Sequence, residues 1–290
     1  MILEYFGPRS VSETLQLLGK WKGEAKLIAG GTNVVPYIRA KVSRREALID
    51  LSHLKSLSYI KEEKKRIRIG ALTTMSELVA SLAIQKHARI LHDAVWQIGN
   101  PLVRNRATIA GNLADASPAA DSAVPLLVLD ASVVVEKHKG KRKQISIDEF
   151  FAGPNKTVLK RDELIREIVF PKPNPSARTA YSKLGLRNAM AISLVSVGVM
   201  AELEKGKCNR VRIALGAVAP TPRRACGVEN LLVGQVITEE LIDQCCEAVQ
   251  KEIQPITDVR STLEYRRSMT SVLLKRLLQQ VFSNNAVQVK

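Results

Sequence analysis

Ala29-Gly30-Gly31-Thr32-Asn33 joins an apolar segment at Ala25 to Ala29 to a helical turn at Val34 to Ala40. A helix pattern at Ser10 to Leu18 precedes it, and a second apolar segment at Ala47 to Leu51 follows. This order of helix, strand, glycine turn, helix and strand predicts a small α/β unit. Adjacent glycines permit close backbone approach to a ligand, and successive N–H groups can form a nest for an anion such as a pyrophosphate. A tight strand–helix turn also explains the glycine pair. The stretch is neither a Walker loop nor a Gly-x-Gly-x-x-Gly turn.

A second stretch rich in small residues runs from Thr108 to Asp121, as TIAGNLADASPAAD. Small side chains allow the backbone to approach an extended ligand, and Asp121 can accept hydrogen bonds from ribose hydroxyls, as acidic residues do in other dinucleotide sites. The alternative is a buried loop in which aspartate and serine cap helices.

The remaining sequence predicts further α/β structure and then an α+β segment. Thr74 and Glu77 have the capping-box spacing, and Pro171, Pro173 and Pro175 mark a linker. The other predicted elements are a hairpin at 57–60 and 66–70, a helix at 90–98, strands at 191–203 and 211–218, and helices at 239–253 and 261–282.

The 290 residues are 46% hydrophobic and 25% charged, which is typical of a globular chain of two domains. The net charge of +16 is compatible with nucleic acid, an anionic cofactor or an acidic partner. The two densest basic runs, Lys61–Arg66 and Lys137–Lys143, lie between apolar alternating segments, so we interpret them as solvated hairpin turns. Only 4% of residues are aromatic, which is poor for stacking on bases.

The four cysteines show no metal-site or disulfide spacing, and the histidines show none either. We therefore expect free thiols and no metal in this chain. No signal peptide and no apolar run of about 18 residues is visible. These features predict a cytoplasmic protein without a membrane span.

Together, the two glycine-containing stretches resemble the signature loops of the FAD-binding subunits of the molybdenum hydroxylases. This family includes the flavin domain of xanthine dehydrogenase and the medium subunit of carbon monoxide dehydrogenase. Val103–Ala107 precedes the second loop as in the family, although Ala110 stands where the family often has glycine. Glu264-Tyr265-Arg266-Arg267 with Val272-Leu273 resembles the signature of the family's C-terminal domain, so the resemblance covers the whole chain.

The resemblance implies an α/β plus α+β fold. A two-lobed FAD-binding domain like that of the vanillyl-alcohol oxidase-type enzymes would be followed by a small C-terminal α+β domain. The expected division is 1–56 for the first lobe, 57–175 for the second lobe and 176–290 for the C-terminal domain. FAD would lie between the first two lobes.

The resemblance also implies which residues contact FAD. The first loop should hold the pyrophosphate through Leu27, Ile28, Ala29, Gly30, Gly31, Thr32, Asn33 and Val34. The second loop should continue the pyrophosphate and ribityl contacts through Thr108, Gly111, Asn112 and Asp115, with Asp121 on a sugar hydroxyl. Positions along the flavin are Ile98, Gly99, Val103 and Ala107, with Lys183 near it, and Leu164 and Ile165 lie near the adenine or flavin edge. Ile98 replaces the phenylalanine of xanthine dehydrogenases, which removes ring stacking from that position.

The implied function is electron transfer from [2Fe–2S] clusters through FAD to an acceptor such as NAD+, with no catalytic acid or base in this chain. The expected partners are a large molybdopterin subunit and a small [2Fe–2S] subunit, assembled as a dimer of heterotrimers. Two alternatives are a stand-alone flavin oxidoreductase of the same wider fold and a basic nucleic-acid-binding module.

Overall fold

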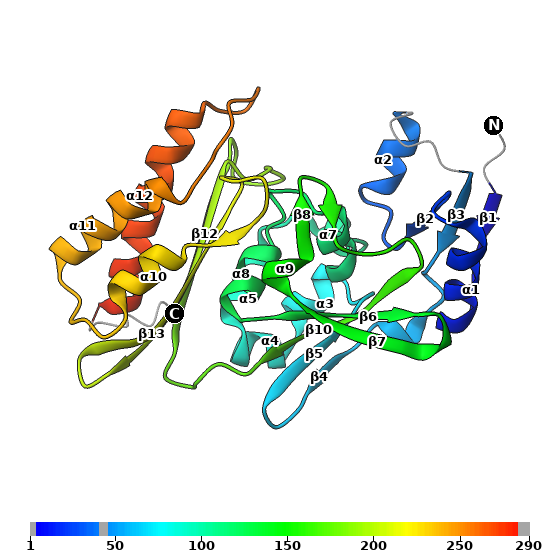
Figure 1. The fold of residues 1–290 in the computed structure, drawn as a ribbon, viewed down its shortest axis with the longest axis horizontal. Coiled ribbons are helices and arrows are strands. Elements are labelled where there is room, and N and C mark those ends of the chain that lie inside the picture. The colour runs from blue at the N-terminus through cyan, green and yellow to red at the C-terminus, as the bar shows by residue number, and fades with distance from the viewer. Residues whose placement is uncertain (1–3, 41–45, 284–290) are drawn as a thin grey trace.

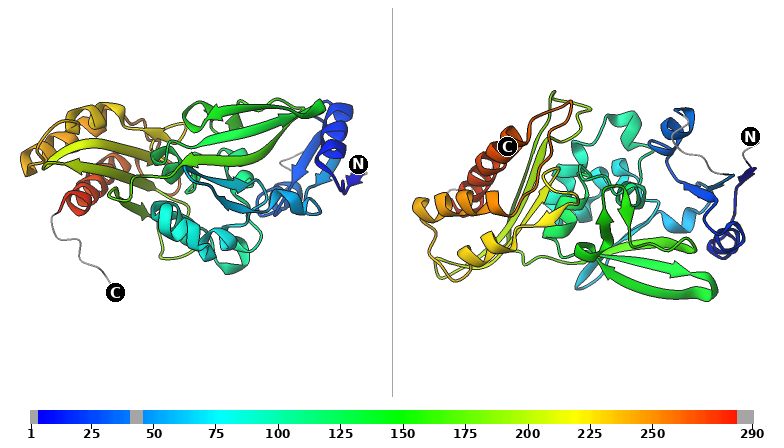
Figure 2. Two further views of the ribbon diagram at one scale, coloured as in Figure 1. Left: turned by 90° about the horizontal axis from the view of Figure 1, so that it is seen from below. Right: turned by 45° about the horizontal axis from the view of Figure 1, so that its top comes forward.

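The computed structural model describes residues 4–40 and 46–283. Three parts follow one another along the molecule (Figure 1). We call residues 4–56 the first lobe, 57–175 the second lobe and 176–283 the C-terminal part. The first lobe and the C-terminal part lie at opposite ends, with the second lobe between them (Figure 2, right). Within the described ranges, no helix is both long and apolar enough to cross a membrane.

The first lobe is a parallel three-stranded sheet with a helix on it. The sheet order is β1 (Glu4–Phe6), β3 (Ala47–Asp50) and β2 (Ala25–Ile28). Helix α1 (Val11–Trp21) begins because the Ser10 side chain accepts a hydrogen bond from the backbone N–H of Glu13, which satisfies one of the free donors of the first turn. The short α2 (Val34–Arg39) follows the glycine turn. The predicted order of elements is confirmed.

The second lobe is built on an antiparallel five-stranded sheet. Its order is β4 (Ile60–Glu62), β5 (Arg66–Gly70), β10 (Glu163–Pro171), β6 (Ser132–Lys137) and β7 (Lys141–Ser146). Both basic runs are hairpin turns, between β4 and β5 and around η2 (His138–Gly140), as predicted. The other elements are η1 (Lys55–Leu57), α3 (Met75–Ala80), α4 (Leu82–His87), α5 (Arg89–Trp96), α6 (Pro101–Arg104), α7 (Ile109–Asp115), α8 (Ala123–Val128), α9 (Ile147–Phe150), β8 (Phe151–Gly153) and β9 (Lys156–Thr157). The Thr74–Glu77 capping box is present at the start of α3.

The C-terminal part is an antiparallel sheet with helices on both faces. Its order is β11 (Arg178–Leu184), β12 (Val195–Glu204), β13 (Lys207–Gly216) and β14 (Arg223–Arg224). One face carries α10 (Cys226–Leu232), α11 (Glu239–Ala248), η3 (Val249–Lys251) and α12 (Leu263–Phe282). Helices α5 and α8 of the second lobe pack on the other face (Figure 1). The first eight residues of β12 are buried because both faces of the sheet are covered.

The sequence-based elements in this part differ from the structure in several places. Strand β13 begins at Lys207, four residues before the predicted start, and α10 was not predicted. Strand β12 begins at Val195, four residues after the predicted start, because residues 185–194 form a loop. Strand β11 was not predicted, since its sequence RTAYSKL mixes charged and small residues without a clear alternation of period two.

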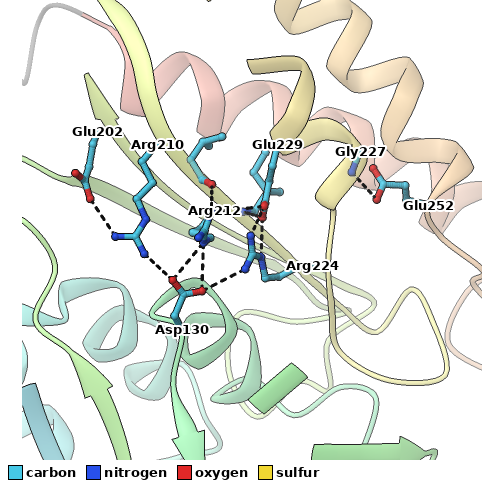
Figure 3. Close-up of polar contacts among 10 residues, drawn as sticks. Asp130, Glu202, Arg210, Arg212, Arg224, Gly227, Glu229 and Glu252 are labelled. Carbon is cyan, nitrogen blue, oxygen red and sulfur yellow. Dashed lines mark hydrogen bonds and ion pairs between the residues drawn. The ribbon is translucent and has the colours of Figure 1, made fainter. Parts of the chain in front are cut away.

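An ionic network joins the second lobe to the C-terminal part (Figure 3). The Asp130 carboxylate accepts hydrogen bonds from Arg210 at 2.6 Å, Arg212 at 3.2 Å and Arg224 at 3.2 Å. Arg224 also binds Glu229 of α10. Because Asp130 comes from the second lobe and its partners from β13 and β14, this network holds the two parts together.

Candidate functional site

A cavity of about 350 Å³ lies between the two lobes. All of its lining residues belong to the first or the second lobe. They are Leu18, Ala25, Lys26, Leu27, Ala29, Gly30, Gly31, Thr32, Asn33, Val34, Leu51, Ala71, Leu72, Ile98, Val103, Ala107, Thr108, Ala110, Gly111, Asn112, Ala114, Asp115, Leu159, Lys160, Arg161, Glu163, Leu164 and Ile165. Both glycine-containing stretches therefore meet at one cavity, as expected for a ligand held between lobes.

The backbone of the first loop packs directly on the second lobe. A β-carbon at position 30 would lie 1.7 Å from the carbonyl oxygen of Arg106, so only glycine fits there. Gly31 has φ +74°, in the left-handed region that favours glycine. Each glycine thus answers a separate requirement: Gly30 brings the lobes together, and Gly31 turns the chain into α2.

The same loop carries unpaired backbone donors. In the described part of the chain, the backbone N–H groups of Gly30, Gly31, Thr32 and Asn33 donate to no protein acceptor, whereas the N–H of Val35 returns to the carbonyl oxygen of Gly31. Four successive free donors beside a cavity form a site for anionic oxygen atoms. This donor set fits the pyrophosphate of FAD.

The second loop forms the opposite wall. The Thr108 hydroxyl accepts a hydrogen bond from the backbone N–H of Gly111 at 3.1 Å and so caps α7. The side-chain amide of Asn33 donates to Asp115 across the cavity at 2.7 Å. The carboxamide oxygen of Asn112 accepts from the Ser122 hydroxyl at 2.6 Å. The two predicted loops are therefore bonded to each other directly, which sets the width of the cavity between them.

Apolar surface lies on both sides of these loops. Ile98 and Val103 lie beside the C-terminal end of α5 and in α6, on the side of the second lobe that faces the C-terminal part. On the other side, Leu18 of α1 and Leu164 of β10 belong to the wall near the outer end of the molecule. The donor loop thus separates two apolar ends, an arrangement suited to a molecule with two ring systems joined by phosphates.

Four of the residues predicted to contact FAD do not line this cavity. They are Ile28, Gly99, Asp121 and Lys183. Gly99 lies behind Val103, since a β-carbon at position 99 would lie 2.8 Å from the Val103 side chain. A β-carbon added at position 31 would lie 3.4 Å from the Ile28 side chain, so Ile28 is a neighbour of the loop.

Asp121 and Lys183 instead form a buried ion pair. Lys183 Nζ donates to Asp121 Oδ2 at 2.5 Å, with the two side chains 6% and 9% exposed. The other oxygen of Asp121 accepts from the hydroxyls of Ser193 at 2.5 Å and Tyr181 at 3.3 Å. Burial, and then the Asp121 charge, raises the pKa of Tyr181 well above its usual value, so this phenol stays protonated. Lys183 Nζ also approaches the carbonyl oxygen of Gln97, next to the lining residue Ile98. The cluster therefore borders the end of the cavity that Ile98 lines, without entering it.

Sequence reasoning missed 12 of the 28 residues that line the cavity. The missed residues are Leu18, Ala25, Lys26, Leu51, Ala71, Leu72, Ala110, Ala114, Leu159, Lys160, Arg161 and Glu163. The apolar members lie on strands and helices that pattern analysis places in the core, and nothing local distinguishes a lining leucine from a core leucine. The charged pair Lys160-Arg161 precedes a strand and gives no motif signal.

Comparison with known proteins matches nearly the whole chain. Residues 1–173 match the family model described as the FAD binding domain in molybdopterin dehydrogenase, and residues 179–281 match that of the CO dehydrogenase flavoprotein C-terminal domain. The carbon monoxide dehydrogenase medium chain of Hydrogenophaga pseudoflava is 32% identical over 98% of each chain. A nicotinate dehydrogenase FAD-subunit of Eubacterium barkeri is 30% identical over 94% of each. A solved carbon monoxide dehydrogenase from Hydrogenophaga pseudoflava has a chain that superposes with a TM-score of 0.93 at 32% identity, covering 97% of this chain and 99% of that one.

Proposed function

Because this chain belongs to the family of FAD-binding subunits of the molybdenum hydroxylases, we propose that it holds FAD in the cavity between its two lobes and passes electrons from partner-bound clusters to an external acceptor. The observation that supports this placement is the loop of four unpaired backbone donors, Gly30 to Asn33, between two apolar ends of one cavity. Bound FAD supplies the redox chemistry, and the protein supplies binding, orientation and electrostatics.

The residues of the chain would divide this work by position. The first loop would bind the pyrophosphate, with Thr108, Gly111, Asn112 and Asp115 opposite it. Ile98, Val103 and Ala107 would line the isoalloxazine side, and Leu27, Leu164 and Ile165 the adenosine side. Ile98 offers an aliphatic surface and no aromatic ring for stacking. No side chain of this chain needs to take up or release a proton for electron transfer.

Lys183 would act on the flavin from the edge of the cavity. Its ammonium group is held by Asp121 and the carbonyl of Gln97, one residue before Ile98. We therefore assign to Asp121 the role of positioning Lys183. The contact of Asp121 with a sugar hydroxyl, which the resemblance implies, stays a prediction.

The proposal also covers the partner subunits and the electron acceptor. Relatives of matching length are named as FAD-subunits or medium chains of dehydrogenases, which supports assembly with a large molybdopterin subunit and a small [2Fe–2S] subunit. A dimer of such heterotrimers and NAD+ as acceptor are the forms we propose for this enzyme. The net charge of +16 suits acidic partner surfaces. The four thiols are free, as is usual in the cytoplasm, where we place the complex.

The domain division that we propose follows the three largest sheets. The first lobe would end near residue 56, the second near residue 175, and the C-terminal domain would take the rest of the chain. The proline-rich segment between β10 and β11 supports the second boundary, since proline lacks the N–H that a strand ladder requires.

The test is retention of flavin by the purified chain. Flavin absorbance that survives desalting, or that is restored by titration with FAD, is the expected result. Gly111→Asp should abolish retention, because Gly111 lines the cavity and an added carboxylate there would repel the pyrophosphate. The added β-carbon would lie 2.7 Å from the Thr108 hydroxyl, so that side chain must shift, and thermal unfolding of the variant checks that the fold is kept.

Gly19→Asp is the matched control. Gly19 is an exposed helical glycine of α1 with no atom within 4 Å of an added β-carbon. Equal retention by wild type and Gly111→Asp would contradict the placement of FAD. Absence of flavin from the wild type alone and from its assembled complex would contradict the function.

A further inference from the structure

Arg161 crosses from the second lobe to the first at one end of the cavity. It lies between β9 and β10, and its Nη1 donates to the carbonyl oxygen of Lys22 at 3.2 Å. Lys22 is the left-handed residue that ends α1. This is a contact between side chain and backbone across 139 positions of sequence, and Arg161 is itself a lining residue of the cavity.

The path of the Arg161 side chain depends on Gly23. A β-carbon at position 23 would lie 2.5 Å from Arg161 Cδ and 3.0 Å from Nε. Gly23 has φ +98°, a conformation that side chains rarely adopt. The backbone of the first lobe is thus shaped to let the arginine stem lie against it.

This end of the cavity is basic as well as apolar. Lys26, Lys160 and Arg161 line it together with Glu163, whose carboxylate is already bound by Lys143 and by the backbone N–H of Lys160. Arginine carries five N–H donors in a planar fork, and Arg161 uses one of them within the described residues. The remaining donors are available to a phosphate or to a ring at the cavity wall.

The position along the cavity separates Arg161 from the flavin side. Helix α1 lies at the outer end of the molecule, whereas α5 packs on the C-terminal part, with α7 between them in Figure 1. If the isoalloxazine lies by Ile98 and the pyrophosphate at Gly30 to Asn33, then only the adenosine half of FAD reaches Arg161. FMN lacks that half.

We propose that Arg161 is a specificity-determining residue that closes the adenosine end of the cavity over the ligand and makes the cavity prefer FAD to FMN. This inference rests on the proposed function, since it requires FAD in the cavity. The hydrogen bond from Arg161 to the carbonyl oxygen of Lys22 would also hold the two lobes at the spacing that the adenosine half needs.

The test compares ligand halves on the full-length chain. Dissociation constants of FAD, FMN and ADP are measured for wild type, Arg161→Ala and Arg161→Lys. Those of FMN and ADP are obtained by displacement of FAD where their direct signals are weak. Arg161→Ala should weaken FAD and ADP by a similar factor of about ten, and FMN by less than about two. Arg161→Lys should lie between, because it keeps the charge and loses the fork.

Arg223→Ala is the control, since Arg223 is an exposed arginine of β14, outside the cavity wall. Equal weakening of FMN and ADP by Arg161→Ala would show a general structural effect and overturn the inference. Unchanged FAD and ADP affinities would overturn it too. If the wild type binds FAD but Arg161→Ala does not weaken FAD and ADP selectively, the role of Arg161 is contradicted and the proposed function stands. If the wild type binds none of the three ligands, both proposals are contradicted.

Discussion

Asp121 and Asp130 stand just before and after helix α8, and each carboxylate is bound by three donors from the C-terminal part. Asp121 accepts from Tyr181, Lys183 and Ser193, and Asp130 from three arginines (Figure 3). All six residues of α8 are buried. Helix α8 therefore packs between the second lobe and the C-terminal part through apolar side chains, with a bound carboxylate at each end. These contacts orient the C-terminal part on the FAD-binding lobes.

Replacing Asp121 by Asn should destabilise the chain by about 3 kcal/mol or more, because the buried Lys183 ammonium loses its counter-charge. Denaturant unfolding at neutral pH measures the difference. Asp93→Asn is the comparison: Asp93 pairs with the exposed Arg89 at 2.8 Å and should lose less than about 1 kcal/mol. The double variant Asp121→Asn/Lys183→Met should lose less than the sum of the single losses; strict additivity would argue against the pair.

Replacing Asp130 by Asn should loosen the C-terminal part from the second lobe. Arg210, Arg212 and Arg224 would then face one another without the shared carboxylate. Calorimetry should show a van't Hoff to calorimetric enthalpy ratio below that of the wild type, since the parts would unfold less cooperatively. Asp162→Asn, which removes an ion pair with Lys137 inside the second lobe, should leave the ratio unchanged. An unaltered ratio in Asp130→Asn would mean that α8 packing alone couples the parts.

The Glu167 carboxylate gives a pH-dependent contribution to stability. Burial opposes its ionisation, but hydrogen bonds from Arg68 at 2.8 Å and Tyr59 at 2.5 Å bring the pKa of Glu167 below its usual value. Because the pKa of Glu167 is lower in the folded than in the unfolded chain, its ionisation contributes to the free energy of unfolding. The contribution is fully present above the unfolded-state pKa of about 4.3 and is lost as the pH falls through the folded-state pKa.

Glu167→Gln should therefore lose on the order of 3 kcal/mol at pH 7 and progressively less as the pH falls below about 4. Unfolding curves of both proteins across that range measure the difference. Burial and, after it, the hydrogen bond to Glu167 raise the pKa of Tyr59 to about 12. Tyr59 therefore stays protonated and remains a hydrogen-bond donor over this pH range. A difference that stays constant with pH would show that ionisation of Glu167 is not the source.

Gly31→Ala should weaken FAD binding more than it weakens the fold. The substitution forces alanine to φ +74° beside Val35, at a strain of about 1–2 kcal/mol, in the loop of free donors. Gly206→Ala imposes the same strain at φ +78° in open space on the β12–β13 hairpin. Both variants should lose similar stability in thermal unfolding, and only Gly31→Ala should lose FAD affinity. A shared loss of affinity would point to general destabilisation.

Local sequence was enough to predict many of the longer elements and the two loops of the site. Helix caps such as Ser10 and the Thr74–Glu77 box depend only on contacts three residues apart. The loops were found because both carry small residues where a backbone must come close to another group, and Gly30 and Gly31 show that need in the structure.

The remaining part of the site could not be predicted because it depends on contacts between distant segments. Arg161 binds the carbonyl oxygen of Lys22 only once the two lobes have come together. Asp121 does not line the cavity, and its carboxylate binds donors that lie 60 to 72 positions away in the sequence. A carboxylate that is suited to a sugar hydroxyl is equally suited to a lysine, and only the fold determines which group reaches it.

The amino-acid sequence by itself determined many of the helices and strands, the family resemblance and the two loops that line the cavity, because hydrophobic period, capping and backbone freedom are local properties. The tertiary structure alone decided the width of the cavity, through the Asn33–Asp115 bond and the contact of Gly30 with Arg106. It also decided which charges line the cavity and which form a buried ion pair beside it, as Asp121 and Lys183 do, since a buried charge takes the partner that folding brings to it.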